Sequence, residues 1–457
     1  MEQISKLISD VAGFMWGWPL LVLLLGTHLF LTVRLKFIQR YIGTAIRLSV
    51  KKDPGSKGEI SQFSALATSL AATIGTGNII GVSTAVVMGG PGAVFWVWIT
   101  GVLGISTKYG EGLLAVKYRK KNPDGSFSGG PMYALEYGLK SKFLAVLFAL
   151  FTAFAAFGMG ATVQANALAS TLNEGFGLNK MYIGIALFFL IGFIIIGGLK
   201  SISRVCDKLI PFMAVFYVAG CLIVLILGYD TLLASIGLIV KSAFTGHAAA
   251  GGFAGSTIMM AARYGVARGL YSNESGLGSA PIVAATAKTR NPVRQALVSS
   301  SGTFWDTVII CALTGLVLVN TGAWSAGKDG VHVAQQAFNF AFHGYGGYFL
   351  CISLVTFSFS TIIGWAYYAE KSVEYLWGMK SVIYYKVVYL LMVFAGTVLS
   401  IDIVWNLSDV FNGLMAIPNL IALLLLSGVI VSETKKYLWS GALDASEENH
   451  PDNEHKK

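Results

Sequence analysis

Two glycine-interrupted polar runs lie inside long apolar stretches of the sequence. Residues 71–78 read Ala-Ala-Thr-Ile-Gly-Thr-Gly-Asn, and residues 269–278 read Gly-Leu-Tyr-Ser-Asn-Glu-Ser-Gly-Leu-Gly. Glycine lets a helix open, and an opened helix in an apolar medium must find polar partners for its freed backbone groups. Freed amides suit a carboxylate, and freed carbonyls suit an amine or Na⁺. The pair of runs therefore predicts a binding site, whereas for the first run alone a packing face with Gly77 and Gly81 in small-xxx-small spacing is the alternative.

Two further apolar stretches carry hydroxyl and amide side chains. Ser360 and Thr361 are adjacent, and their oxygens together with freed carbonyls would form a neutral cage that suits Na⁺, a hard cation. The alternative is that each hydroxyl bonds to its own helix. Trp365 follows Thr361 by one helical turn, so both can face one cavity. Gln164 and Asn166 are amides in an apolar helix, where interhelical hydrogen bonding is the alternative to substrate binding.

Ionisable side chains inside the apolar stretches are functional candidates, because a charge is costly within a membrane. Arg263, Arg268 and Glu274 share the stretch that holds the second glycine run, and they are candidates for a gate or a charge pair as well as for substrate binding. Asp306 is a similar candidate. It would serve either as an ion ligand or as a cap or partner for a base in a loop.

Other polar residues fit structural roles. Lys108 and Glu111 are spaced i, i+3 and are expected to satisfy each other, and His28 is interpreted as structural. No HExxH motif, GxSxG motif or Cys/His cluster occurs in the sequence, so no enzyme is predicted. The cysteines lack metal-ligand spacing and are expected to be inert packing residues. They are Cys206, Cys221, Cys311 and Cys351.

The composition indicates which elements must position these residues. The chain has 457 residues, of which 55% are hydrophobic and 12% charged, and its mean hydropathy is +0.66. Soluble domains carry about 25% charged residues, so a soluble globular protein is excluded, and the high hydrophobicity excludes a disordered chain. The net charge of +10 comes from bases between apolar segments, not in one stripe, which argues against nucleic-acid binding. An all-α polytopic membrane protein is predicted.

Eleven membrane-spanning helices are predicted from the hydropathy of the chain. Their approximate limits are 14–34, 62–88, 92–116, 143–171, 181–199, 209–229, 255–287, 299–321, 346–371, 382–400 and 404–431. Two short amphipathic helices are expected between spans, near Met132–Leu139 and Val333–Phe342. The first span is too long for a cleavable signal and is expected to be retained.

Lysine and arginine are concentrated in the loops that follow odd-numbered spans. The positive-inside rule then predicts an outside N-terminus and a cytoplasmic C-terminus in a plasma membrane of bacterial or archaeal type. Spans 2–6 and 7–11 repeat the same order of a glycine-interrupted helix and, two spans later, a polar-rich helix. Because five is odd, the two sets have opposite topology, as in secondary transporters. We therefore expect an extra helix and basic cytoplasmic loop over 1–61, five-helix repeats over 62–229 and 230–431, and a polar cytoplasmic tail over 432–457.

Several runs resemble motifs of the alanine or glycine–sodium symporter family. They are Gly-Gly-Pro-Gly-Ala-Val-Phe-Trp-Val-Trp at 89–98, Ala-Thr-Ile-Gly-Thr-Gly-Asn-Ile at 72–79, Gly-Gly-Pro-Met-Tyr at 129–133, the run 268–281, and Asn-Gly-Leu-Met-Ala-Ile-Pro-Asn at 412–419. The similarity extends from about Gly13 to Lys436, and Val97 stands where methionine is usual. It implies a leucine-transporter-type fold, of the amino acid–polyamine–organocation superfamily, with an added first helix. It also implies import of small neutral amino acids with Na⁺.

The same resemblance implies the site residues. The substrate-binding residues would be Thr73, Gly75, Thr76, Gly77, Asn78, Gln164, Tyr271, Ser272, Gly276, Thr361 and Trp365. The Na⁺ ligands would be the carbonyls of Ala71 and Ile74 and the hydroxyls of Ser360 and Thr361. Tyr271 and Ser275 stand where phenylalanine and alanine are common in the family, and each adds a hydroxyl near the pocket. A large indole at Trp365 beside Tyr271 would leave room for little more than a methyl or hydroxymethyl side chain.

We therefore expect a Na⁺-coupled importer of alanine, glycine or a similar small neutral amino acid that works by alternating access. Glutamine or serine as substrate, or H⁺ as coupling ion, are the alternatives within transport. An amino-acid-gated channel or sensor is the alternative from another class, and it is less favoured because the sequence contains no carbonyl-filter signature. Na⁺, the amino acid and the lipid bilayer are the expected partners, and no organic cofactor, nucleic acid or obligate protein partner is expected.

Overall fold

The structure, a computed structural model of the chain, describes residues 2–51, 53, 56–245, 258–326, 330–399 and 402–446. Helices form almost all of the regular structure in these residues, as the composition predicts. The strands among them are β1 (Lys120–Lys121) and β2 (Phe127–Ser128), which pair as an antiparallel hairpin.

The first half of the chain is a mixture of long, broken and short helices. Its helices are α1 (Glu2–Met15), α2 (Trp18–Arg34), η1 (Ile38–Tyr41), α3 (Ile42–Val50), α4 (Gln62–Thr73), η2 (Gly77–Gly81), α5 (Val82–Gly89), α6 (Gly92–Lys117), α7 (Pro131–Tyr133), η3 (Ala134–Gly138), α8 (Lys142–Ala155), η4 (Ala156–Thr162), α9 (Val163–Phe176), α10 (Lys180–Ile196), α11 (Gly198–Leu227) and α12 (Tyr229–Thr245). Ser61 is the N-cap of α4, and Asn179 is the N-cap of α10. In each, the side-chain oxygen accepts a hydrogen bond from a backbone amide of the first turn.

The second half repeats the mixture of long, broken and short helices. Its helices are α13 (Ile258–Asn273), α14 (Pro281–Ala284), α15 (Pro292–Thr303), η5 (Phe304–Cys311), α16 (Ala312–Asn320), η6 (Ala323–Ala326), α17 (Gly330–Phe342), α18 (Gly346–Trp377), η7 (Met379–Ser381), α19 (Val382–Val398), α20 (Asp402–Leu425), α21 (Ser427–Thr434) and η8 (Lys435–Trp439). Asn291 caps α15, and Pro292 occupies its first position, where a missing N–H costs nothing.

Within the described residues, seven helices are long and apolar enough to cross a membrane, or eight if the bent pair α4 and α5 counts as one span. The chain is thus a multi-pass membrane protein. α6, which carries two lysines and one glutamate, and the 16-residue α13 lie outside this set. The predicted total of eleven spans and the two five-helix repeats therefore stay predictions.

Both predicted helix breaks are present. α4 and the η2–α5 segment are bent by 55° at residues 74–76. α13 ends at Asn273, and the chain then runs through a turn-rich segment with positive φ at Glu274, Gly276 and Gly278 before α14 begins. The predicted amphipathic helices are present as α7–η3 and α17.

Several helices occupy stretches that the sequence predicts as loops. α1, α3 and α12 lie outside the predicted spans, and α11 begins eleven residues before its predicted start at 209. Their basic and acidic residues lower the mean hydropathy, although the apolar side chains between them pack against neighbouring helices. Residues 255–257 of the predicted span 255–287 and the tail after residue 446 lie outside the described residues.

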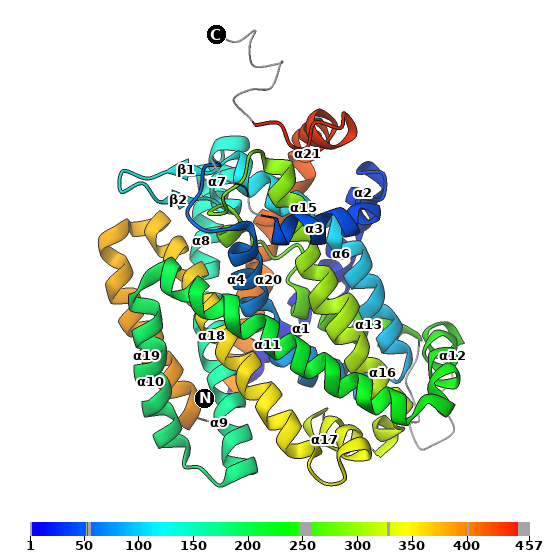
Figure 1. Cartoon of the computed structure of the whole chain (residues 1–457). Coiled ribbons are helices and arrows are strands. Elements are labelled where there is room, and N and C mark those ends of the chain that lie inside the picture. Colours follow the sequence, from blue (N-terminus) through cyan, green and yellow to red (C-terminus); the bar gives the residue numbers. More distant parts are fainter. Residues whose placement is uncertain are drawn as a thin grey trace, which may run out of the picture.

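The arrangement places the two breaks in the middle of the bundle. α6 packs against α13 and α15, and α18 packs against α4, α9 and α11. Figure 1 shows the hairpin, α3 and α21 at one end of the molecule and α12 and α17 at the other. The hairpin, α3 and α21, which lie in or beside segments predicted to be cytoplasmic, are therefore at the same end of the bundle.

Candidate functional site

The two broken helices meet at their interruptions. Gly77 in η2 lies against Tyr271 and Ser272 in α13, and a Cβ atom built on Gly77 would be 3.5 Å from both Ser272 Cα and Tyr271 Cδ1. η5 packs against both segments. Two runs that are far apart in the sequence thus form one surface, and glycine permits their close approach.

Asn78 organises the first break. The Gly75 amide donates to Asn78 Oδ1 at 2.9 Å. In a continuous helix the Gly75 amide would donate to the carbonyl of Ala71. At the break the Ala71 carbonyl therefore lacks this hydrogen bond. The Thr76 amide donates to Gln164 Oε1 of α9 at 3.4 Å. Amides at the start of the second half-helix therefore already face polar acceptors, which is the arrangement that a carboxylate ligand would use.

The carbonyl of Ile74 receives two hydroxyls from α18. Thr361 Oγ1 lies 3.2 Å and Ser360 Oγ 3.4 Å from the Ile74 oxygen. The same hydroxyls lie 3.0 and 2.8 Å from the carbonyl of Phe357 in their own helix. Both interpretations of this hydroxyl pair thus apply: it bonds back to its helix, and it faces the break. The three oxygens at the break form a neutral group of the kind that a hard cation prefers.

Small residues let α18 approach α4 this closely. A Cβ atom on Gly364 would lie 2.7 Å from the Ala72 amide nitrogen, and one on Gly75 would lie 2.6 Å from Thr361 Oγ1. Thr73 is buried at the end of α4, and its hydroxyl bonds back to its own helix at 3.5 Å. No side chain larger than hydrogen therefore fits at Gly75 while Thr361 keeps its place.

A buried carboxylate from α6 holds the second break. Glu111 Oε1 accepts the amides of Gly276 and Gly278 at 3.0 and 3.1 Å. These two amides converge because the backbone between them is partly left-handed, with φ of +92° and +87° at the two glycines. The freed amides of this break are therefore satisfied by the protein itself.

Glu111 has further partners that the sequence spacing does not reveal. Its pairing with Lys108 is present at 3.8 Å, as the i, i+3 spacing predicts. In addition, Asn419 of α20 donates to Glu111 Oε1 at 2.8 Å and to the Gly276 carbonyl at 2.9 Å. A Cβ atom on Gly276 would lie 2.6 Å from Leu24 of α2. Gly276 thus faces α2 and is already hydrogen-bonded at both backbone groups.

Trp365 and Tyr271 are both buried near the breaks. Trp365 Nε1 donates to Glu274 Oε1 at 3.0 Å, and the other Glu274 oxygen accepts the hydroxyl of Ser279. The Tyr271 ring packs edge-on against Trp16, with ring centroids 6.2 Å apart. Its hydroxyl is buried without a hydrogen-bond partner among the described residues. An unpartnered hydroxyl beside the breaks is a polar group that a ligand could satisfy.

The predicted charge pair between Glu274 and an arginine does not form in the described residues. Arg263 is exposed and lies over the ring of Tyr264, and Arg268 lies over the ring of Tyr271, each at 5.8 Å from the centroid. Glu274 follows the end of α13 in a left-handed conformation (φ +53°). This turn carries its side chain toward α18 instead of along the helix face that holds the arginines.

Asp306 joins the two breaks from η5. Its Oδ1 accepts Asn78 Nδ2 at 2.7 Å, and its Oδ2 accepts the hydroxyls of Ser272 and Thr307 at 3.0 and 2.6 Å. The carboxylate is fully buried. Neither a helix cap nor a base from a loop accounts for it in the described structure. Thr307 adds an oxygen that the sequence pattern did not single out, because threonine is common in apolar helices.

Two other candidates have structural contacts. His28 is buried, and its Nδ1 lies 2.7 Å from Thr107 Oγ1 of α6. Asn166 donates to the carbonyl of Gly396 in α19 at 3.2 Å, which is the interhelical role. All four cysteines are buried and free.

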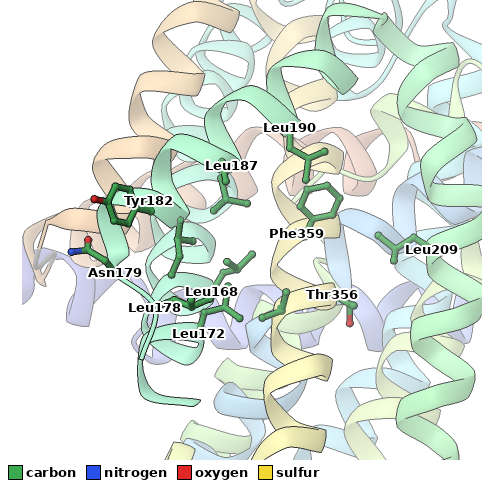
Figure 2. Close-up of a pocket in the computed structure, with 13 residues that line it drawn as sticks. Leu168, Leu172, Leu178, Asn179, Tyr182, Leu187, Leu190, Leu209, Thr356 and Phe359 are labelled. Atoms are coloured by element: carbon green, nitrogen blue, oxygen red, sulfur yellow. The ribbon is translucent and has the colours of Figure 1, made fainter. Parts of the chain in front are cut away.

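A separate apolar cavity lies on the other side of α18. Figure 2 shows this cavity of about 490 Å³ between α9, α10, α11 and α18, with Leu172, Leu187, Leu209 and Phe359 around it. No charged side chain lines it. Its lining suits hydrocarbon, so the polar groups at the two breaks, not this cavity, are the candidate site for a zwitterion.

The sequence and the fold of this chain are both similar to those of known proteins. The model of the sodium:alanine symporter family matches residues 1–451. The sodium/alanine symporter AgcS of Methanococcus maripaludis is 48% identical over 447 residues, which are 96% of this chain and 98% of that protein. The probable sodium/glutamine symporter GlnT of Bacillus subtilis is 37% identical over 442 residues, covering 96% and 91%. Among solved structures, MhsT in complex with L-phenylalanine aligns with a TM-score of 0.56 at 14% identity and covers 85% of this chain and 100% of that one. This likeness shows a shared transporter fold, of the leucine-transporter type that the sequence motifs imply.

Proposed function

The chain belongs to the sodium:alanine symporter family, and on that premise we propose that it imports a small neutral amino acid, alanine or glycine, together with Na⁺. The observation that carries the proposal is the meeting of two broken helices beside the Ile74, Ser360 and Thr361 oxygens. An amino acid has one carboxylate and one ammonium, and broken helices offer both amides and carbonyls. The oxygen group adds a place for Na⁺ next to the same break.

The donors and acceptors at the first break indicate which groups would bind the amino acid and which would bind Na⁺. The amides of Gly75 and Thr76 lie at the start of a half-helix, where the dipole favours a carboxylate, and the Asn78 and Gln164 side chains that hold them can turn to the ligand. Na⁺ would bind the Ile74 carbonyl and the two hydroxyls of α18. Because the ion and the substrate share one break, each would favour the conformation that the other needs.

We propose the predicted sidedness as well. The N-terminus would lie outside and the C-terminus in the cytoplasm of a bacterial or archaeal plasma membrane. The basic loops support this orientation, and the end of the bundle that carries the hairpin, α3 and α21 would then face the cytoplasm.

Glutamine is the second candidate substrate, because the family includes a relative with the printed name of a probable sodium/glutamine symporter. The Tyr271 hydroxyl, which is without a hydrogen-bond partner among the described residues, would favour a more polar side chain than that of alanine, whereas the Ser275 hydroxyl bonds to Thr303 at 3.1 Å. Uptake into proteoliposomes separates the candidates. A symporter accumulates labelled amino acid against its gradient when Na⁺ is imposed outside, and the preferred substrate competes best. Uptake that a pH gradient drives without Na⁺ would point to H⁺ coupling, and absence of uphill accumulation would point to a channel or sensor.

Replacing Trp365 with alanine is expected to weaken alanine transport and to admit larger amino acids, because a buried indole next to the breaks is removed. Competition of labelled alanine uptake by a panel of amino acids measures the profile. Trp365→Phe is the comparison variant, since it keeps a smaller aromatic ring in the pocket and loses the hydrogen bond to Glu274. If Trp365→Ala has the wild-type profile, Trp365 does not bound the pocket.

Replacing Ser360 with alanine is expected to raise the Na⁺ concentration for half-maximal alanine binding by about three- to tenfold, since one oxygen of a neutral group is lost and a hydrogen bond of about 1 kcal/mol corresponds to a factor of that order. Purified protein and labelled alanine across a Na⁺ titration give the midpoint. Ser353→Ala is the control, because Ser353 is equally buried in α18 and only bonds to its own helix, at 2.9 Å from the Phe349 carbonyl. Equal midpoints for the two variants would leave Ser360 with the structural role alone.

A further inference from the structure

A second apolar cavity, the α3–α11 groove, lies between α3, α4, α11 and η5 and has a volume of about 490 Å³. The described residues that line it are apolar apart from Ser49, and the Ser49 hydroxyl bonds to the Ile46 carbonyl of its own helix at 2.7 Å. Val50 and Val215 line the groove and are exposed, so the groove is open to the outside of the bundle. In a multi-pass membrane protein, an open apolar groove suits the acyl chain of a lipid.

The groove follows α4 along its length. Phe63, near the start of α4, lines it, and so does Ile74, directly after the end of α4. α3, which supplies Ile46 and Val50, lies at the end of the bundle that also carries the hairpin and α21 (Figure 1). In the proposed sidedness this end faces the cytoplasm. The groove therefore extends from the cytoplasmic surface of the membrane to the first break.

Three exposed bases, which we call the rim bases, flank the cytoplasmic end of the groove. Arg47 lies on α3 next to Ile46, and Lys208 and Arg204 precede Pro211 on α11 by three and seven residues. Residues at these spacings share one face of a helix, so the two bases of α11 continue the face that lines the groove. Long basic side chains lie along apolar surface and hold their charge at its edge.

The rim bases take part in no ion pair among the described residues. The acid between the two bases of α11, Asp207, turns to α4 instead, where its Oδ2 accepts the Ser64 hydroxyl at 2.8 Å. This contact also places the turn of α11 that carries the bases beside the start of α4. A fourth base, Lys51 at the end of α3, pairs with Asp444 at 3.8 Å on the exposed surface. The cytoplasmic end of the groove therefore carries positive charge without a partner.

We propose that the α3–α11 groove binds an anionic phospholipid of the cytoplasmic leaflet, with an acyl chain along α4 and α11 and its phosphate among the rim bases. Basic sites between membrane helices on the cytoplasmic side suit acidic lipid headgroups. A soluble anion would match the bases and leave the apolar groove uncovered. A zwitterionic lipid would bring its own ammonium to the bases, and like charges at a contact weaken binding. An anionic lipid matches both parts of the site.

An occupied groove would also affect transport, and this part of the inference rests on the proposed function. The Ile74 side chain lines the groove, while the Ile74 carbonyl receives the hydroxyls of Ser360 and Thr361. Leu70, one turn earlier, lines the groove too. An acyl chain packed against Leu70 and Ile74 would favour the conformation in which α4 lies against α18 and the oxygen group is formed. Anionic lipid should therefore lower the Na⁺ concentration that alanine uptake requires.

Trp305 lines the groove and can report binding directly. The full chain is reconstituted with brominated phosphatidylglycerol or brominated phosphatidylcholine over a series of mole fractions, since bromine quenches indole fluorescence at short range. The Trp305 contribution is the difference between wild type and Trp305→Phe. We expect phosphatidylglycerol to quench this contribution at a mole fraction about tenfold or more below that of phosphatidylcholine. Equal quenching by the two lipids would overturn the inference.

Variants of the rim bases assign the preference to them. Arg47→Gln, Arg204→Gln and Lys208→Gln should each weaken it by up to about fivefold, which corresponds to about 1 kcal/mol for a base near an anionic surface, and the three together should abolish it. Lys380→Gln is the matched control, because Lys380 is an exposed base of η7 that does not line the groove. A preference that survives the triple variant, or that Lys380→Gln loses, would overturn the site.

The link to transport is tested by labelled alanine uptake across a Na⁺ titration, in liposomes of phosphatidylcholine with and without phosphatidylglycerol. For the wild type, phosphatidylglycerol should lower the half-maximal Na⁺ concentration several-fold, and for the triple variant it should leave that concentration unchanged. An unchanged value for the wild type would overturn the link between the groove and the first break. Failure of the wild type to accumulate alanine with Na⁺ in either lipid would instead overturn the proposed function, and the quenching result would stand.

Discussion

Replacing Glu111 with alanine is expected to cost about 3–5 kcal/mol of folding stability, the usual effect of removing one member of a buried ion pair, and to abolish transport. The variant leaves the ammonium of Lys108 buried without its carboxylate and takes the acceptor from the amides of Gly276 and Gly278. The second break would then lack the group that holds it open. Thermal unfolding of purified protein and uptake in proteoliposomes measure the two effects.

Two comparisons make this result specific. Glu111→Gln keeps an oxygen for the amides but loses the charge, so it should retain more stability than Glu111→Ala. Lys142→Ala removes one member of an exposed pair with Glu136, at 2.8 Å, where solvent screens the charge of the lysine, and it should cost about 1 kcal/mol or less. If Glu111→Ala unfolds at the same temperature as Lys142→Ala, other contacts hold the second break.

Replacing Gly75 with alanine is expected to weaken Na⁺-dependent alanine binding more than tenfold. The new Cβ atom would lie 2.6 Å from Thr361 Oγ1 and 3.4 Å from Gln164 Oε1. Relief of such an overlap costs about 1–3 kcal/mol, and about 1.4 kcal/mol is a factor of ten in affinity. Either Thr361 moves away from the Ile74 carbonyl or α4 moves away from α18, and both open the oxygen group.

Gly81→Ala is the control for this variant. Gly81 ends the small-xxx-small motif that begins at Gly77, two residues after Gly75, and a Cβ atom there would come no closer than 3.9 Å to Arg268, which is ordinary contact. Alanine binding by equilibrium dialysis at several Na⁺ concentrations compares the two. Near-wild-type binding by Gly75→Ala would mean that Thr361 does not serve in the site, and a large loss with Gly81→Ala would favour packing as the role of the whole motif.

The positions of both breaks were predictable because they depend on local chemistry. Gly75 and Gly77 interrupt an apolar run, and the second interruption at a matching place makes a packing role less probable than a site. The hydroxyls of Ser360 and Thr361 were predictable for the same reason, since polar oxygens in an apolar helix need partners. In the structure, that partner is the Ile74 carbonyl, which both hydroxyls contact.

Long-range partners were not predictable from spacing. Glu111 has a base at i−3, and the spacing predicts a pair with it alone, yet its shorter contacts are with the second break and with Asn419 of α20. Glu274 lies in the same predicted span as two arginines, but it follows the end of α13 in a left-handed conformation and points toward Trp365. In both cases the tertiary fold overrides the local pattern, and only the three-dimensional arrangement shows which groups meet.

Reciprocal binding of alanine and Na⁺ tests the central claim most directly. Alanine affinity is measured on purified protein at a series of Na⁺ concentrations, and Na⁺ affinity at a series of alanine concentrations. Linkage requires that the factor by which saturating Na⁺ tightens alanine binding equals the factor by which saturating alanine tightens Na⁺ binding. A site in which the ion and the amino acid share one broken helix predicts a factor well above one, equal in both directions. Alanine binding that is independent of Na⁺ would contradict it.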